Sequence, residues 1–253
     1  MNNSGCEDKS VSKIVARGAE GLGVILPPGI AKSFEMYYTL LERNAKVFNL
    51  TAITGAEEVA RLHFLDSLAL MGVMSYKNAR VIDIGSGAGF PGLPLKLADP
   101  SIELTLLDAS AKRVEFLTEL CLTLGVDAAC VHARAEEFAR IPEGREQFEI
   151  ALSRAVSKLS VLCELCLPLL KVGGVFLAMK SDKSAEELEN SHNAINILGA
   201  ELKGTVNYTI PETEITRSVI IISKTSQTPK EFPRRFAKIK KTPIISSFRN
   251  NSV

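Results

Sequence analysis

The sequence lacks the long apolar run that a membrane protein needs. No stretch approaches the roughly 20 consecutive apolar residues that cross a bilayer. Residues 1–13 are polar and lack the apolar core of a signal peptide. Tryptophan is absent from the 253 residues, of which 46% are hydrophobic and 23% charged, the composition of an ordinary globular chain. We therefore expect one α/β domain with extensions, in the cytoplasm and without a membrane partner.

Cysteine is scarce and is not arranged for chemistry. The five cysteines are Cys6, Cys121, Cys130, Cys163 and Cys166, and most of them stand inside apolar segments, where a free thiol packs like a small hydrophobic group. No second Cys/His pair accompanies Cys163 and Cys166 at the spacing of a zinc site. We therefore expect no metal, and we favour core packing on a helix over a nucleophilic role for these two thiols.

Net charge is nearly absent as well, at +1, but it is unevenly distributed. Residues 224–253 carry eight Lys/Arg against the single acid Glu231, a charge of +7, which leaves −6 for residues 1–223. Such a segment is either a solvated charge run or a nucleic-acid contact. The residues that we expect to bind RNA are Arg234, Arg235, Lys238, Lys240 and Lys241.

The hydrophobic pattern divides the chain into three parts. Residues 1–75 form an N-terminal helical extension, in which residues 1–13 are loose and a helix begins at Pro27-Pro28, followed by helices over Gly55–Leu62 and Phe64–Met74. Residues 76–224 alternate strands and helices, and residues 225–253 form a basic tail that either orders on binding or wraps the domain. The predicted strands are Val81–Ile84, Leu104–Leu107, Ala128–His132, Phe148–Leu152, Gly173–Lys180, Leu202–Tyr208 and Ser218–Ser223. This order predicts a mostly parallel seven-stranded sheet closed by an antiparallel pair.

A glycine-rich loop follows the first strand, directly behind Asp83. Gly85, Gly87 and Gly89 let the backbone turn sharply and approach a ligand closely. Asp108 ends the second strand, where a carboxylate can accept both ribose hydroxyls of an adenosine. Glu136 follows the third strand and adds a polar group at the adenine side of the same crevice. The pattern predicts a class I (Rossmann-like) methyltransferase that uses S-adenosylmethionine.

The main alternative is a nicotinamide enzyme, because residues 87–92 also read as G-x-G-x-x-G. Three observations favour the methyl donor. Asp83 can hold the cationic, phosphate-free methionine part of a sulfonium cofactor, and Pro91 stands where a pyrophosphate would meet helix N–H groups. The closing antiparallel strands also leave no second mononucleotide-binding half.

Several motifs resemble one family. They are Asp83-Ile84-Gly85-Ser86-Gly87-Ala88-Gly89-Phe90-Pro91-Gly92-Leu93-Pro94, Leu106-Leu107-Asp108, Lys112-Arg113-Val114-Glu115-Phe116-Leu117, Ala133-Arg134-Ala135-Glu136-Glu137, Ser153-Arg154-Ala155, Asn49-Leu50-Thr51, and His63 with Asp66-Ser67-Leu68. From about residue 30 to 244 the chain is similar to the bacterial ribosomal small-subunit methyltransferase G family, also called glucose-inhibited division protein B. The resemblance implies methylation of N7 of one guanine in 16S ribosomal RNA, free or within the 30S subunit, by a monomer that uses S-adenosylmethionine.

The resemblance also implies site residues. The family's cofactor contacts fall on Gly85, Phe90, the pair Ala135-Glu136, and Arg154. We assign Arg154 a catalytic role as a clamp on cofactor or target nucleotide; the alternative is a structural ion pair with a loop acid. His63 contacts RNA or is a hydrogen-bonded histidine between helices, and Asn49 and Thr51 cap the helix that follows them.

The sequence departs from the family pattern at three places. Leu62 separates Arg61 from His63, Val156-Ser157-Lys158 replaces a more usual Phe-Ala-Ser, and Phe236-Ala237 stands where a Pro-Gly or similar pair is common. We expect the first and third of them to alter RNA contacts and none of them to touch the cofactor loop. Phe90, Tyr37 and Tyr38 are the aromatic candidates for stacking a flipped guanine, although the two tyrosines suit a helix core better.

Overall fold

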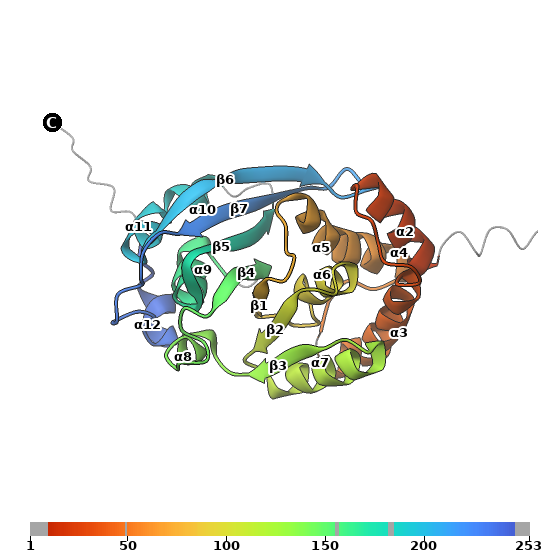
Figure 1. The fold of residues 1–253 in the computed structure, drawn as a ribbon, viewed down its shortest axis with the longest axis horizontal. Helices are drawn as coiled ribbons and strands as arrows, with labels where there is room; N and C mark the ends of the chain where they lie inside the picture. Colours follow the sequence, from red (N-terminus) through yellow and green to blue (C-terminus); the bar gives the residue numbers. More distant parts are fainter. Residues whose placement is uncertain (1–9, 49, 155–156, 182–184, 246–253) are drawn as a thin grey trace, which may run out of the picture.

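A seven-stranded sheet forms the centre of the molecule (Figure 1). The structure is a computed structural model that describes residues 10–48, 50–154, 157–181 and 185–245. The strands are β1 (Arg80–Ile84), β2 (Glu103–Asp108), β3 (Ala128–His132), β4 (Phe148–Arg154), β5 (Leu170–Ser181), β6 (Ala200–Thr209) and β7 (Thr216–Lys224). Their order is β3-β2-β1-β4-β5-β7-β6. The four pairings that join β3, β2, β1, β4 and β5 are parallel. The two pairings that join β5, β7 and β6 are antiparallel, as the sequence predicts.

The strand order places a switch point beside β1. The chain runs from β1 outward through β2 to β3 and then returns to β4 on the other side of β1. Loops after β1 and β4 therefore leave the sheet in opposite directions and open a crevice at the carboxyl ends of these strands, where open α/β sheets bind ligands.

Helices cover both faces of the sheet. After β1 they are α6 (Gly92–Ala98), α7 (Ala111–Leu124), α8 (Ala135–Phe138), α9 (Leu159–Cys166), η3 (Leu167–Leu169), α10 (Ala185–Glu189), α11 (His192–Ile197) and α12 (Phe236–Lys241). Successive strand residues enter opposite cores, as Val81 and Ile82 do, because side chains alternate along a strand. One core includes residues of the N-terminal helices, α6 and α7, and the other includes residues of α8, α9, α11 and α12.

The N-terminal region differs from the prediction in detail. Its helices are α2 (Val11–Gly21), α3 (Ala31–Phe48), α4 (Ala56–Val59), η1 (Ala60–Leu65), α5 (Asp66–Leu68) and η2 (Ala69–Gly72). The expectation of a loose start is wrong beyond residue 10, because α2 buries Val11, Ile14 and Val15 against the core. Pro27-Pro28 does not begin a helix either, since α3 starts at Ala31.

A further difference lies between residues 56 and 72. The two predicted helices with a break near His63 are one continuous helical run, whose middle turn, η1, is π-helical. π-Helical turns widen a helix by one residue and are frequent at functional sites. Among the described residues, no helix is both long and apolar enough to cross a membrane.

The described part of the basic C-terminal segment, residues 225–245, wraps the domain. Arg145 donates from Nη1 to the carbonyl of Phe232 at 2.9 Å and from Nη2 to that of Thr228 at 2.7 Å. Ile239 of α12 is buried in the core beside α9. Of the two forms expected for this segment, the wrap is the one present over these residues; Arg249 lies outside the described residues.

Candidate active site

The glycine loop turns at the end of β1 through left-handed backbone. Gly85, Gly87 and Gly89 have φ of 71°, 58° and 98°, values that side-chain-bearing residues rarely adopt. At Gly89 a Cβ would also lie 2.5 Å from the Tyr37 hydroxyl, which donates to the carbonyl of Ala88. Around Gly87 the nearest atom to a Cβ would be 3.8 Å away, so the space in front of the loop is open. The loop is thus packed against Tyr37 at Gly89 and is accessible at Gly87.

Phe90 is fixed inside the loop by three aromatic neighbours. Its ring is parallel to that of Tyr37, with centroids 5.2 Å apart, and is nearly parallel to that of His63 at 4.4 Å. Phe64 packs at 5.6 Å in a tilted arrangement. The Phe90 side chain is buried, and so is Tyr37, which is a core residue as the sequence favours. Stacking of Phe90 on a flipped base would therefore displace neighbours.

Asp108 is oriented by backbone groups at the end of β2. Its Oδ2 accepts from the Gly87 N–H at 3.0 Å, and its Oδ1 accepts from the Ser110 N–H at 2.8 Å. The Arg113 guanidinium lies 3.7 Å from Oδ2. A carboxylate has about four acceptor positions, so both oxygens can accept further hydroxyl groups. The arrangement fits a ribose diol.

Asp83 lies under the same loop and is fully buried. Its Oδ2 accepts from the Gly92 N–H at 2.8 Å, whereas Oδ1 has no hydrogen-bond partner among the described residues. Burial raises the pKa of Asp83 to about 7, while the Gly92 hydrogen bond and nearby Arg154 oppose that rise. A buried acceptor without a donor is costly, and a cationic ligand near the loop would compensate this one.

A cavity of about 140 Å³ lies in front of the carboxyl ends of β1, β2 and β3. Its walls include Gly85, Ala109, Ala135, Glu136 and Phe236. Glu136 is largely buried at the start of α8. Of the predicted cofactor residues, Gly85, Ala135 and Glu136 line this cavity. Asp108 lies at its edge, directly after cavity-lining Leu107, and is bonded to Gly87. Asp83 and Gly89 are buried and do not line the cavity. The open loop, oriented carboxylate and apolar floor fit an adenosine with a cationic end.

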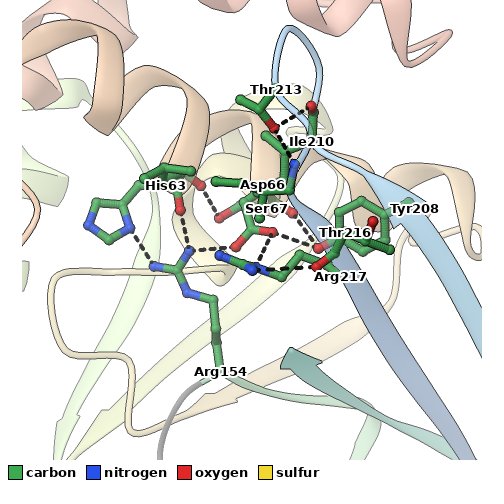
Figure 2. A network of polar contacts seen from close by, with 11 residues as sticks. His63, Asp66, Ser67, Arg154, Tyr208, Ile210, Thr213, Thr216 and Arg217 are labelled. Atoms are coloured by element: carbon green, nitrogen blue, oxygen red, sulfur yellow. Dashed lines mark hydrogen bonds and ion pairs between the residues drawn. The ribbon is translucent and has the colours of Figure 1, made fainter. Parts of the chain in front are cut away.

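Arg154 ends β4 and reaches into the N-terminal helices (Figure 2). Nη1 donates to Asp66 Oδ2 at 3.0 Å and to the carbonyl of Leu62 at 3.2 Å, and Nη2 donates to His63 Nδ1 at 2.8 Å. The guanidinium carbon is 5.0 Å from the centre of the Phe90 ring. The ion pair expected as the alternative role of Arg154 is therefore present, with an acid on a helix; its contact with a ligand stays a prediction.

His63 is a neutral hydrogen-bonding link. Burial, and secondarily the positive charge of Arg154, lowers its pKa to about 3. Arginine can only donate, so Nδ1 is the acceptor and the proton is on Nε2. Nε2 therefore donates to Thr51 Oγ1 at 2.8 Å, and the same oxygen accepts from the Ile53 N–H. Thr51 thus orders the turn at residues 51–53. The expectation that it caps the following helix is wrong, because the N-cap of α4 is Gly55 and no side chain bonds there. Asn49, the other residue expected to cap that helix, lies outside the described residues.

Asp66 is the centre of this network. Besides Arg154, its Oδ1 accepts from the Tyr208 hydroxyl at 2.7 Å and faces Arg217 Nε at 3.8 Å (Figure 2). Tyr208 and Arg217 are directly paired across β6 and β7. The sequence reasoning did not assign these two residues to the site. The predicted antiparallel pair could have suggested them, but only with a register that the loop length alone does not fix.

A second cavity, of about 420 Å³, opens beside the network. Its charged walls are Asp66, Arg154, Lys180 and Arg217, and its apolar walls include Ile53 and Met179. Both cavities adjoin the glycine loop, because Arg154 and His63 contact Phe90 whereas Gly85 lines the smaller cavity. Over the described residues, no cluster of three potential metal ligands occurs.

The residues predicted to bind RNA lie in and around α12. Arg235, Lys238, Lys240 and Lys241 are exposed. Arg234 instead bonds with Glu164, whose side chain is fully buried: the Arg234 N–H and Nε each donate at 2.8 Å and Nη2 at 2.6 Å. The Arg234 guanidinium is therefore committed within the molecule, and a phosphate would have to compete with this ion pair.

Comparison with known proteins identifies relatives over nearly the whole chain. A curated ribosomal RNA small subunit methyltransferase G from Acetivibrio thermocellus is 41% identical over 94% of this chain and 98% of its own. One from Alkaliphilus metalliredigens is 48% identical over 81% of this chain and 86% of its own. The solved structure of a methyltransferase from Pyrococcus furiosus, 14% identical, superimposes with a TM-score of 0.54 over 77% of this chain and all of its own, which supports the fold. The model of the family described as rRNA small subunit methyltransferase G (GidB) matches residues 30–216. The chain therefore belongs to the rRNA small subunit methyltransferase G family.

Proposed function

We propose that the chain is an enzyme that transfers a methyl group from S-adenosylmethionine to N7 of one guanine in 16S ribosomal RNA, acting as a monomer in the cytoplasm. Its membership of the rRNA small subunit methyltransferase G family is the observation that carries this proposal. The RNA is presented either free or within the 30S subunit.

The donor would lie across the ends of β1 and β2. Asp108 would accept the ribose hydroxyls, Gly85, Ala135 and Glu136 would enclose the adenine end, and Asp83 would face the positively charged methionine part. When bound, the cofactor supplies a methyl group on a positively charged sulfur. The residues of the crevice bind and orient it.

The target guanine would enter the cavity beside Arg154. Guanine N7 carries a free lone pair in the ring plane, so no proton has to be removed before attack. Neutral His63 already uses both ring nitrogens, one toward Arg154 and one toward Thr51, which suits a positioning residue and not a base. The remaining requirements are alignment of the reacting atoms and tolerance of a cationic purine. Arg154 would hold the nucleotide at the edge shared with the glycine loop.

We further propose three functional parts. Residues 1–75 complete the cavity beside Arg154, since His63 and Asp66 belong to them. Residues 76–224 form the methyltransferase domain. Residues 225–253 bind the RNA backbone through Arg235, Lys238, Lys240 and Lys241, and through Arg234 where it leaves Glu164.

The test maps N7-methylguanosine in 16S rRNA from cells with and without this protein. Loss of one modified position in the deletion strain, restored by the wild-type chain but not by Asp108→Ala, is expected. Unchanged methylation would overturn the proposal. Transfer of tritiated methyl to a small molecule, and not to 30S particles or their RNA, would identify a small-molecule methyltransferase instead. Light scattering of the purified chain tests the monomer.

A further inference from the structure

One wall of the smaller cavity comes from outside the methyltransferase domain. Phe236, the first residue of α12, is half-buried and lines this cavity together with Gly85, Ala109 and Ala135. The same side chain also lines a wider groove of about 740 Å³ beside α8. The ring thus separates the crevice at the strand ends from the open surface of the C-terminal segment.

The position of Phe236 is fixed by the segment that carries it. Arg140 and Arg145 donate to backbone carbonyls at Pro233 and Phe232, and Arg234 is bonded to buried Glu164. On the other side, Ile239 buries α12 in the core next to α9. With anchors on both sides, the backbone at Phe236 stays against the cavity.

The ring is also held by a charged neighbour. The Arg134 guanidinium carbon lies 6.0 Å from the centre of the Phe236 ring, within the range of a cation–π contact. Arg134 directly precedes Ala135 and Glu136, which line the same cavity. The loop after β3 and the C-terminal segment therefore meet at this ring.

A cavity of about 140 Å³ is smaller than the roughly 300–1,000 Å³ of sites for whole small molecules. It is suited to the flat, apolar base of a nucleoside and not to the complete cofactor. Aromatic rings stabilise bases through their π-faces regardless of hydrogen-bond pattern. At this position the sequence differs from the family pattern, because Phe236-Ala237 occupies the place where the family commonly has a Pro-Gly or similar pair.

We propose that Phe236 is a cofactor-binding residue that covers the adenine base from the C-terminal segment. The proposal rests on the proposed function, because that function assigns this crevice to S-adenosylmethionine. It goes further in making the C-terminal segment part of the donor site as well as of the RNA surface.

The first experiment measures dissociation constants by calorimetry for S-adenosylhomocysteine and for adenosine with the full-length chain. Phe236→Ala should weaken both ligands by a similar factor, about 5- to 100-fold, which is the effect of removing one base–aromatic stack. Phe236→Leu, which keeps apolar volume, should lose less. The matched control is Phe232→Ala, four residues earlier on the same anchored segment and packed on the same core, but not lining the cavity.

The second experiment uses the absence of tryptophan from the sequence. Phe236→Trp places a single reporter in the cavity wall, and its emission should change on addition of adenosine or S-adenosylhomocysteine. Leu122→Trp, on the exposed side of α7, where Leu122 is 77% exposed, should not respond. This readout is independent of catalysis.

The outcomes separate the inference from the function on which it rests. If wild type binds and Phe236→Ala binds within twofold of it, or if Phe232→Ala loses as much, the inference is wrong and the proposed function stands. A loss for S-adenosylhomocysteine without a loss for adenosine also overturns it, because the contact would then not be with the base. A wild-type chain that binds neither ligand overturns the proposed donor site and the inference together.

Discussion

Arg154 at the end of β4 and Asp66 in the N-terminal helices form a largely buried ion pair, with Nη1 and Oδ2 3.0 Å apart. The pair joins two parts of the chain that are separated by 88 residues. It also lies against the cavity proposed for the target base. The pair can therefore contribute both to the stability of the fold and to methyl transfer. Measurements of the free energy of unfolding and of activity on the same variants distinguish these two contributions.

We expect Arg154→Ala to destabilise the fold by about 2–4 kcal/mol, because it leaves Asp66 buried with an uncompensated charge. The retained Tyr208 hydrogen bond and nearby Arg217 keep the loss below the upper end of such effects. Urea unfolding of Arg154→Ala, Asp66→Ala and the double variant measures the coupling. Additive single effects would mean that the pair is not coupled in solution.

The Arg154→Lys variant tests the geometry. A lysine keeps the charge but cannot bond Asp66 and His63 simultaneously in the same plane. We expect near-normal stability with a clear loss of methyl transfer, because the nucleotide cavity would no longer be ordered. If methyl transfer falls only in proportion to the fraction of unfolded protein, Arg154 has a purely structural role.

Asp83 predicts a pH dependence of stability. With its pKa raised to about 7 by burial, the folded chain keeps this proton between roughly pH 4 and 7, whereas the unfolded chain has lost it. Stability contributed by this group therefore falls as pH rises across that window, by roughly 4 kcal/mol at most. Asp83→Asn should flatten this decline, as measured by urea unfolding at pH 4.5, 6 and 7.5.

The same group predicts the opposite trend for ligand binding. A cationic cofactor favours the ionised carboxylate, so affinity for S-adenosylmethionine should rise between pH 6 and 8 and level off above. In Asp83→Asn the affinity should be lower and independent of pH in that range. An unchanged pH profile in the variant would remove Asp83 from the cofactor site.

Much of this architecture could be predicted because its signals are local. The residues of β3 match the predicted strand Ala128–His132, since turn-forming or charged residues bound it on both sides. The glycine loop and Asp108 could be placed at one edge because parallel strands share their carboxyl ends. Helix α2 was missed because its polar neighbours obscured an apolar face that only packing against α3 makes necessary.

The rest depends on contacts between distant residues. The Asp66 network joins an N-terminal helix to β4 and to the β6–β7 pair, and no periodicity in the sequence specifies those partners. The commitment of Arg234 to Glu164 has the same origin, since a basic run gives no indication of which of its members is paired internally. The sequence shows that Phe236 departs from the family pattern. It does not show that this side chain lines a cavity, because the other residues of that cavity are distant in the chain.

The exposed lysines of α12 predict the salt dependence of RNA binding. Replacing Lys238, Lys240 and Lys241 with alanine should weaken binding to a 16S rRNA fragment and reduce the slope of log K against log salt by about two to three. These substitutions are preferable to truncation, which would also remove Phe236 and the anchors of the segment. Affinity for S-adenosylhomocysteine should be unaffected. An unchanged slope would place the RNA surface elsewhere.

Substitution of Asp108 should cause a large loss of affinity for the cofactor. We expect Asp108→Asn to weaken S-adenosylhomocysteine by about 10- to 100-fold, because an amide accepts fewer hydroxyl protons and places its NH₂ group against the Gly87 or Ser110 N–H. The exposed Asp127→Asn, in the turn after α7, is the matched control for loss of one negative charge. Equal affinities of the two variants would contradict the ribose assignment.

Cys121 on α7 and Cys130 on β3 predict a difference in thiol reactivity. Their sulfur atoms are 3.9 Å apart, and the Cys121 thiol lowers the pKa of Cys130, which is partly accessible. Burial raises the pKa of Cys163 to about 12 and also raises that of Cys166. The thiolate is the reactive form, so iodoacetamide should modify Cys130 at a lower pH than an ordinary cysteine and leave the other two unmodified in the folded chain.

Peptide mass spectrometry across pH 6–9, in a Cys6→Ser background, measures this order. In Cys121→Ala the midpoint for Cys130 should move up toward the ordinary value of about 8.5, because the hydrogen bond from the neighbouring thiol is then lost. An unmoved midpoint would mean that the thiol pair is not responsible. Rapid labelling of Cys163 would contradict the closed core between β5 and α9, since that side chain is fully buried.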